Sequence, residues 1–243
     1  MSDRSAARVV HVLAPMVNEL EAVVEAFALE PDGDGDAYTG RLGEVRVTAC
    51  GTGIGPELAD QVTARVLDGL ATGVVPDHVM VVGICGGLDP WLEVGTFVNP
   101  EVVVDQRDGR AYVHRPPGDR ARSGKLLTTP TLITDLDIVQ GWRDEGFVAV
   151  DMETAAVAAL CERAGVPWSA YRCISDRPSD GLIDDVILEM TRPDGSADLD
   201  VLRRRLDEDP GLSDRLERLY HDSTLATRVA AAAAVTACGH LAG

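Results

Sequence analysis

The sequence lacks cysteine pairs, long apolar runs and any excess of basic residues. No CxxC pair and no histidine at metal-binding spacing accompanies its five cysteines, which are Cys50, Cys85, Cys161, Cys173 and Cys238. An odd number of cysteines scattered through apolar runs indicates buried, reduced thiols. We therefore expect no metal site.

No segment approaches the roughly 20 consecutive apolar residues of a membrane span. The opening residues, MSDRSAARVVHVLAPM, contain no long apolar stretch followed by a small-residue cleavage site. These two features lead us to expect a cytoplasmic protein with no membrane partner.

Basic residues are too few for a nucleic-acid-binding protein. The chain has 22 Lys and Arg against 40 Asp and Glu, and its formal net charge is −18. Binding to phosphate backbones or anionic membranes needs Lys and Arg gathered on one face. We expect an acidic, solvated surface and no nucleic-acid partner.

Aromatic residues are also scarce, at 4% of the 243 residues, whereas hydrophobic residues make up 45%. A core made mainly of Ala, Val and Leu suits helices packed on a sheet. The chain has no internal repeat and no second-domain boundary, so we expect a single domain over residues 1–243. Its part from about residue 191 is expected to be an extended, largely helical segment.

Apolar patterning predicts strands that alternate with helices, as in an α/β sandwich around a mixed sheet. The predicted strands cover residues 8–14, 78–82, 94–105 (broken at Asn99-Pro100), 125–129, 147–150 and 168–173, with a hairpin over 37–50 that turns near Gly43. The predicted helices cover residues 16–29, 57–70 and 135–143, and another begins at the alanines after Glu153. Residues 106–124 are predicted to form a polar surface loop.

Carboxylates stand where three predicted strands end. Glu19 follows the first strand, Glu153 follows strand 147–150, and Asp176 follows strand 168–173. Each has a structural explanation when taken singly: Glu153 favours a helix N-terminus, Asp176 suits a cap or turn, and Glu19 suits a wet helix face. Ligands of open α/β sheets bind beyond the carboxyl ends of the strands, so the combination predicts one site.

Six segments resemble the landmarks of the nucleoside phosphorylase/nucleosidase superfamily, and most closely its methylthioadenosine/S-adenosylhomocysteine nucleosidase type. In chain order they are APMVNELEAV, GTGIGPELA, VVGICGGLDPWLEVGTFV, LLTTPTLI, AVDMETAAVAALCERAGVPW and YRCISD. The resemblance covers Val9 to about Asp180. It implies a three-layer αβα sandwich, a homodimer, a purine nucleoside as small-molecule substrate, and no cofactor.

The resemblance also implies roles for particular residues. Glu19 corresponds to the glutamate that activates the attacking water, and Arg172 to an arginine near that water. Asp176 corresponds to the aspartate that protonates the purine at N7. The remaining positions are implied to bind substrate: Met152 and Glu153 the ribose, Leu132 and Ile133 the base, with Ile84, Gly86 and Ser175 beside them.

The chemistry of such a reaction suits these residue types. Breaking an N-glycosidic bond creates an oxocarbenium-like sugar and a purine anion. A partly protonated carboxyl group can supply a proton to the leaving base, and a carboxylate near the ribose stabilises the developing cation. The resemblance therefore implies hydrolysis of a 5′-modified adenosine to free base and sugar, and the residue types agree with that reaction.

Two departures from the family pattern leave alternatives open. Ile84 stands where nucleosidases usually have a serine, and hexameric phosphorylases have an arginine and a serine at the places of Val81 and Ile84. The loss of these two phosphate ligands favours hydrolysis over phosphorolysis. The segment TRPDGSADLDVLRRRLDEDPGLSDRLERL resembles the tail of hopanoid-associated phosphorylase-like proteins, so an adenosyl-hopane-type substrate is one alternative. The other is a nucleoside-binding protein with this fold and no turnover.

Overall fold

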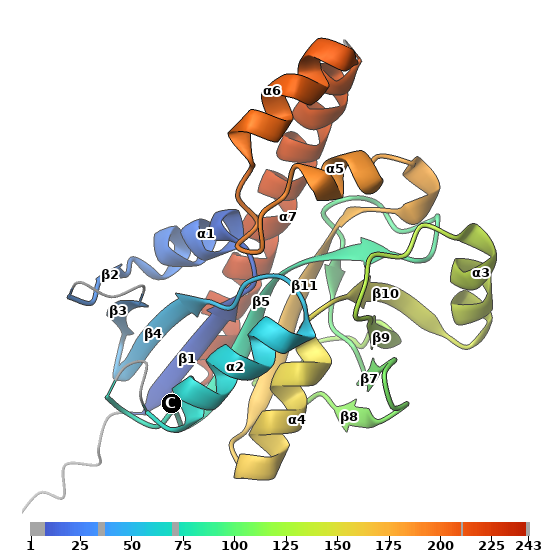
Figure 1. Ribbon diagram of the computed structural model, residues 1–243. Coiled ribbons are helices and arrows are strands. Elements are labelled where there is room, and N and C mark those ends of the chain that lie inside the picture. The colour runs from blue at the N-terminus through green and yellow to red at the C-terminus, as the bar shows by residue number, and fades with distance from the viewer. Residues whose placement is uncertain (1–7, 34–36, 70–72, 210, 242–243) are drawn as a thin grey trace, which may run out of the picture.

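The computed structural model describes residues 8–33, 37–69, 73–209 and 211–241. Its central sheet runs in the order β2-β3-β4-β1-β5-β10-β9-β7-β8, with β11 pairing to β5 and β6 (Figure 1). The strands are β1 (Val9–Ala14), β2 (Glu30–Pro31), β3 (Ala37–Leu42), β4 (Val45–Gly51), β5 (His78–Gly87), β6 (Phe97–Val98), β7 (Val102–Asp105), β8 (Ala111–Val113), β9 (Lys125–Thr128), β10 (Phe147–Asp151) and β11 (Trp168–Asp176).

The sheet is mixed, as predicted. Strand β5 pairs in parallel with β1 and with β11, whereas β10 joins the last residues of β5 in the antiparallel sense. Strands β1, β5 and β11 therefore end at the same edge of the sheet. The residues that follow these strands lie close together there.

Helices cover both faces of the sheet (Figure 1). On one face lie α2 (Pro56–Leu67) and α4 (Thr154–Ala164), and on the other lie α1 (Val17–Phe27) and α7 (Leu212–Gly239). Alternation along β1 supplies both cores: Val12 and Ala14 pack with α1 and α7, while Leu13 packs with α2 and α4. The three-layer αβα sandwich is confirmed.

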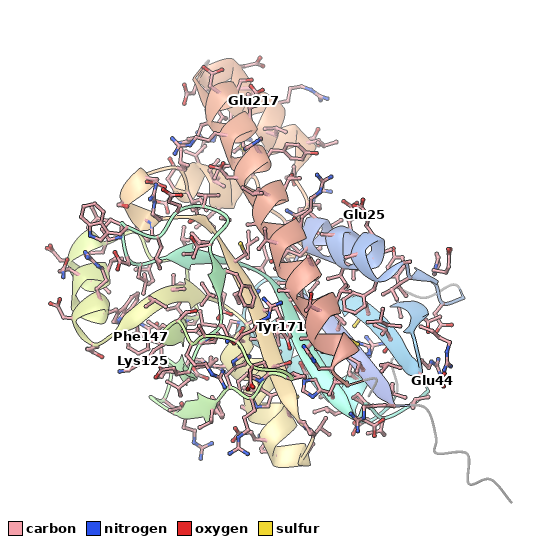
Figure 2. The ribbon with its side chains drawn as sticks, turned by 180° about the vertical axis from the view of Figure 1, so that it is seen from behind. Glu25, Glu44, Lys125, Phe147, Tyr171 and Glu217 are labelled. Atoms are coloured by element: carbon pink, nitrogen blue, oxygen red, sulfur yellow. The ribbon has the colours of Figure 1, made fainter. Side chains whose placement is uncertain are left out.

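Alanine allows these helices to approach the sheet closely. The buried residues of α7 are almost all small: Ala226, Thr227, Ala230, Ala231, Ala233, Ala234, Ala237 and Cys238. Seen from behind, α7 crosses the sheet beside Tyr171 of β11 (Figure 2). The same principle applies to α4, whose buried residues are also mostly small: Thr154, Ala155, Ala156, Val157, Ala158 and Cys161.

The structure corrects several predicted boundaries. The glycine-rich residues after Val82 remain in strand, because β5 stays paired with β11 as far as Gly86. The same ladder extends β11 beyond Cys173 to Asp176. The predicted surface loop contains β8, which pairs with β7 and buries Tyr112. Tertiary pairing overrides the low strand propensity of glycine and polar residues.

Helix boundaries agree more closely with the sequence. Helix α1 ends at Phe27, where Ala28 adopts the left-handed conformation with φ 50°. Helix α2 begins at Pro56, and the predicted end at Leu70 lies outside the described residues. Helix α3 (Leu136–Asp144) begins after Asp135, whose side chain accepts hydrogen bonds from two backbone N–H groups. All five cysteines are buried, as predicted.

The part after β11 is largely helical. It contains the short helix η1 (Pro178–Asp180), then α5 (Asp185–Glu189), α6 (Leu199–Glu208) and α7. Helix α6 and the first half of α7 project beyond the sheet, with α5 at their base (Figure 1). None of the helices in the described residues is long and apolar enough to cross a membrane.

The alanine face of α7 generates a stability prediction. Replacing the fully buried Ala234 with Leu should destabilise the protein by about 1–3 kcal/mol, because extra methylenes overpack a close helix–sheet contact. The exposed Ala232 is the control on the same helix, and its change to Leu should have little effect. Urea unfolding of the two variants measures both; equal stability of the two would contradict close packing of this helix.

Candidate active site

A cavity of about 240 Å³ opens where β1, β5, β10 and β11 end. Each strand exit contributes residues to its wall. They are Pro15 and Met16 after β1, Ile84, Cys85 and Gly86 in β5, Asp151, Met152 and Glu153 at the end of β10, and Ser175 and Asp176 at the end of β11. The position agrees with the general rule that open α/β sheets bind ligands at the carboxyl ends of their strands.

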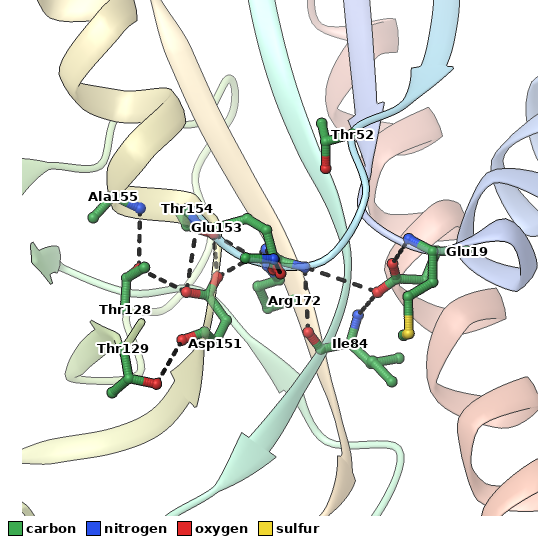
Figure 3. A network of polar contacts seen from close by, with 12 residues as sticks. Glu19, Thr52, Ile84, Thr128, Thr129, Asp151, Glu153, Thr154, Ala155 and Arg172 are labelled. Atoms are coloured by element: carbon green, nitrogen blue, oxygen red, sulfur yellow. Dashed lines mark hydrogen bonds and ion pairs between the residues drawn. The ribbon is translucent and has the colours of Figure 1, made fainter. Parts of the chain in front are cut away.

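Arg172 lies beneath the cavity and is fully buried. One of its terminal nitrogens, Nη2, is 2.9 Å from Asp151 Oδ2 and 3.1 Å from Glu153 Oε2. The other, Nη1, is 3.8 Å from Glu19 Oε1 (Figure 3). Burial alone would lower the pKa of Arg172, but the three carboxylates outweigh it and raise that pKa. The guanidinium therefore stays charged and joins α1 to the junction between β10 and α4.

Glu19 reaches this arginine from the first turn of α1. Its carboxylate accepts hydrogen bonds from the backbone N–H of Met16 and of Ile84, each at 2.6 Å. The carboxylate lies so close to β5 that a Cβ on Gly83 would be 2.1 Å from Glu19 Oε1, so only glycine fits there. Burial raises the pKa of Glu19 to about 7, even though Arg172 and the two N–H groups favour its ionised form.

Glu153 occupies the N-cap position of α4 but makes no side-chain capping bond. Its Oε1 instead accepts from the backbone N–H of Gly55 at 2.8 Å, and its Oε2 accepts from Arg172 at 3.1 Å. Burial raises the pKa of Glu153, the nearby Arg172 opposes the rise, and Asp151 adds to it. Glu153 therefore lies at the helix N-terminus as the electrostatic explanation requires, but its side chain also accepts hydrogen bonds from Gly55 and Arg172.

Asp151 connects β9, β10 and the start of α4 through hydrogen bonds at the same junction. Its Oδ1 accepts from the hydroxyl of Thr128 at 2.6 Å and from the backbone N–H of Thr154 at 3.4 Å. Its Oδ2 accepts from the hydroxyl of Thr154, which in turn accepts from Arg172 Nε at 3.1 Å. Asp151 thus fixes β9, β10 and the start of α4 around the arginine (Figure 3).

Asp176, the last residue of β11, also lines the cavity. Its Oδ1 accepts a hydrogen bond from the Ser175 hydroxyl at 2.6 Å. Burial raises the pKa of Asp176 to about 6; the Ser175 bond opposes this rise, and the charges of Asp180 and Asp222 support it. The carboxyl group therefore gains or loses its proton just below neutral pH.

The structure brings the predicted site residues together. The cavity wall contains nine of them: Glu19, Ile84, Gly86, Leu132, Ile133, Met152, Glu153, Ser175 and Asp176. Arg172, the remaining one, lies behind Glu19 and Glu153. Gly86 is closely confined, since a Cβ there would be 3.2 Å from Val150 Cγ1.

Sequence reasoning missed two groups of residues. The first is the support of Arg172 by Asp151, Thr154 and Thr128; the acidic pair in VDME was the available signal. The second is an apolar wall from the region of α5, formed by Ile183, Ile187 and Leu188. A five-residue helix gives too short a pattern to be recognised as part of a site.

Comparisons with known proteins agree with this geometry. The model of the phosphorylase superfamily matches residues 10–140 and 120–193. The 5′-methylthioadenosine/S-adenosylhomocysteine nucleosidase of Geobacillus thermodenitrificans is 31% identical over 198 residues, which cover 69% of this chain and 79% of the relative. The one from Anoxybacillus flavithermus is 31% identical over 169 residues, or 57% and 71% of the two chains.

A solved structure shows the same fold. The S-adenosylhomocysteine nucleosidase from Streptococcus pyogenes, in complex with 5-methylthiotubericidin, superposes with a TM-score of 0.71 at 15% identity, covering 98% of this chain and 99% of that one. The chain therefore belongs to the phosphorylase superfamily, and the curated relatives it matches there are N-glycosyl hydrolases of the nucleosidase type.

Proposed function

We propose that the protein hydrolyses the N-glycosidic bond of a 5′-modified adenosine, releasing adenine and the free sugar. The observation that carries this proposal is the pair of buried carboxyl groups, Glu19 and Asp176, whose pKa values are raised to about 7 and about 6 on the walls of one cavity. Raised pKa values of this kind suit groups that exchange protons near neutral pH. The nucleosidases named above support the substrate class.

In the proposed mechanism Asp176 donates its proton to the purine N7 as the glycosidic bond breaks. Glu19 accepts a proton from the attacking water, which lies between its carboxylate and the sugar. Glu153 binds the ribose hydroxyls and places negative charge near the oxocarbenium-like carbon, while Met152 packs on the sugar. The protein's own carboxyl groups make each proton transfer, so this chemistry requires no cofactor.

Water is the proposed nucleophile because the anion-binding donors of this pocket are already in use. Glu19 accepts from Met16 N–H and Ile84 N–H, two donors that could otherwise hold a phosphate. Arg172 is bound to three carboxylates. The arginine on the described cavity wall, Arg177, pairs with Asp180 at 3.0 Å. A dianion needs unpaired cationic donors, and this site offers it none.

The cavity wall formed by Ile183, Ile187 and Leu188 is apolar, and this limits the kind of 5′ substituent that we propose. We propose that this substituent lies against the wall, which suits an alkylthio group and disfavours a 5′-phosphate. An adenosyl-hopane-type substrate remains an alternative, because its 5′ group is apolar as well. The homodimer and the cytoplasmic location expected from the sequence remain predictions.

The identity of the products tests the proposal. In phosphate-free buffer we expect adenine and free sugar from methylthioadenosine or S-adenosylhomocysteine, at a rate that added phosphate leaves unchanged. Liquid chromatography with mass detection measures both products. A sugar 1-phosphate would contradict hydrolysis. Tight binding of nucleosides without base release would support the non-catalytic alternative instead.

Protonation states give the second test. Asp176 must carry a proton, and its protonated fraction declines as the pH rises through about 6. Glu19 must be ionised, and its ionised fraction declines as the pH drops through about 7. We therefore expect a bell-shaped profile of kcat/KM with its maximum between these two values.

Asp176→Asn should lower kcat by ~10²–10⁴-fold, because an amide cannot donate the proton.

Asp180 provides the matched control for Asp176. It lies four residues away and pairs with Arg177. Asp180→Asn should keep most of the activity and move the acid limb slightly downward, because the charge of Asp180 helps to raise the pKa of Asp176, which is the lower of the two values. Equal kcat losses in the two variants would remove Asp176 from the role of acid.

A further inference from the structure

Helix α5 forms part of the cavity wall but is too short to hold itself in place. It spans only Asp185–Glu189, and isolated helices of fewer than about 12 residues are marginal in water. Ile183, Ile187 and Leu188 of this region face the cavity, yet Leu188 is 45% exposed. The position of this wall must therefore be set by other parts of the chain.

One end of α5 is tied to α6. Glu189, the last residue of α5, accepts from Arg204 Nη2 at 2.8 Å and from Arg205 Nε at 3.1 Å, with a second contact from Arg205 Nη2. Isolated exposed ion pairs contribute little to stability, but here one carboxylate receives two arginines. The neighbouring Arg203 points elsewhere and pairs with Asp200 at 3.9 Å.

The other end of α5 is tied to α7. Asp184 is its N-cap, and its Oδ1 accepts from the backbone N–H groups of Val186 and Ile187, each at 3.1 Å. The second oxygen, Oδ2, accepts from Arg215 Nη1 at 2.8 Å. The carboxylate that begins α5 is thus also the carboxylate that joins it to α7.

We define the C-terminal arm as α6 together with residues 212–225 of α7. It projects beyond the sheet (Figure 1) and lies after residue 193, where the match to the superfamily ends. We propose that this arm is a positioning element for substrate binding: Arg204, Arg205 and Arg215 hold both ends of α5, so that its apolar residues complete the cavity. The expected change in KM rests on the proposed function. The expected effect on the position of α5 rests on the ion pairs alone.

Three adjacent arginines allow a matched test. The double variant Arg204→Met/Arg205→Met removes both contacts to Glu189, whereas Arg203→Met removes a cation of the same helix that does not reach α5. We expect the double variant to raise KM for methylthioadenosine roughly three- to fivefold with kcat nearly unchanged, and Arg203→Met to change neither. High salt should raise KM of the unaltered protein in the same direction, because exposed ion pairs are screened.

Amide hydrogen exchange supplies a readout that does not depend on activity. The backbone N–H groups of residues 185–190 should exchange several-fold faster in the double variant, and in Arg215→Met, than in Arg203→Met. Unchanged exchange in both variants, or an equal rise of KM in the Arg203 control, would overturn the proposal. If the unaltered protein released no base, the proposed function would fail, while the exchange experiment would still decide the role of the arm.

Discussion

The burial of one positive charge, that of Arg172, governs the arrangement of this molecule. A buried guanidinium is tolerated only when its charge is compensated and its donors are satisfied. Here the compensation comes from Asp151, Glu153 and Glu19, with the Thr154 hydroxyl accepting from Nε and the Ile84 carbonyl from Nη1. These partners belong to α1, β5, β10 and the start of α4. The need to compensate the charge of Arg172 therefore holds both halves of the sheet together.

The same cluster explains why carboxyl groups in the cavity have raised pKa values. Three carboxylates surround one guanidinium, and burial makes full ionisation costly, so the pKa values of Glu19 and Glu153 rise. The pKa of Asp176 is raised mainly by burial as well, and the charges of Asp180 and Asp222 add to the rise. The protein thus keeps two buried carboxyl groups, both with raised pKa values, on the wall of one cavity. Groups of this kind can exchange protons near neutral pH.

Much of this arrangement could be predicted from the sequence, because strand exits and residue types are local features. Glu19, Glu153 and Asp176 each follow an apolar run, and parallel strands bring their exits together. The role of Asp151 is harder to predict from the sequence, since its partners Thr128 and Thr154 are recognised only when β9 and β10 pair. The length of β5 was underestimated because glycine has low strand propensity, while its ladder with β11 is a tertiary feature. The contribution of α5 depends on ion pairs with residues up to 31 positions away, which no local pattern reveals.

The central claim is that Arg172 and its carboxylates act as one unit, and a double-mutant cycle on unfolding free energy tests it most directly. Arg172→Met alone should destabilise the protein by about 3–5 kcal/mol, because it leaves buried carboxylates uncompensated. Adding Asp151→Asn should recover part of that loss, so the two changes together cost less than their sum. Additive losses, or an Arg172→Met variant as stable as the unaltered protein, would contradict the account.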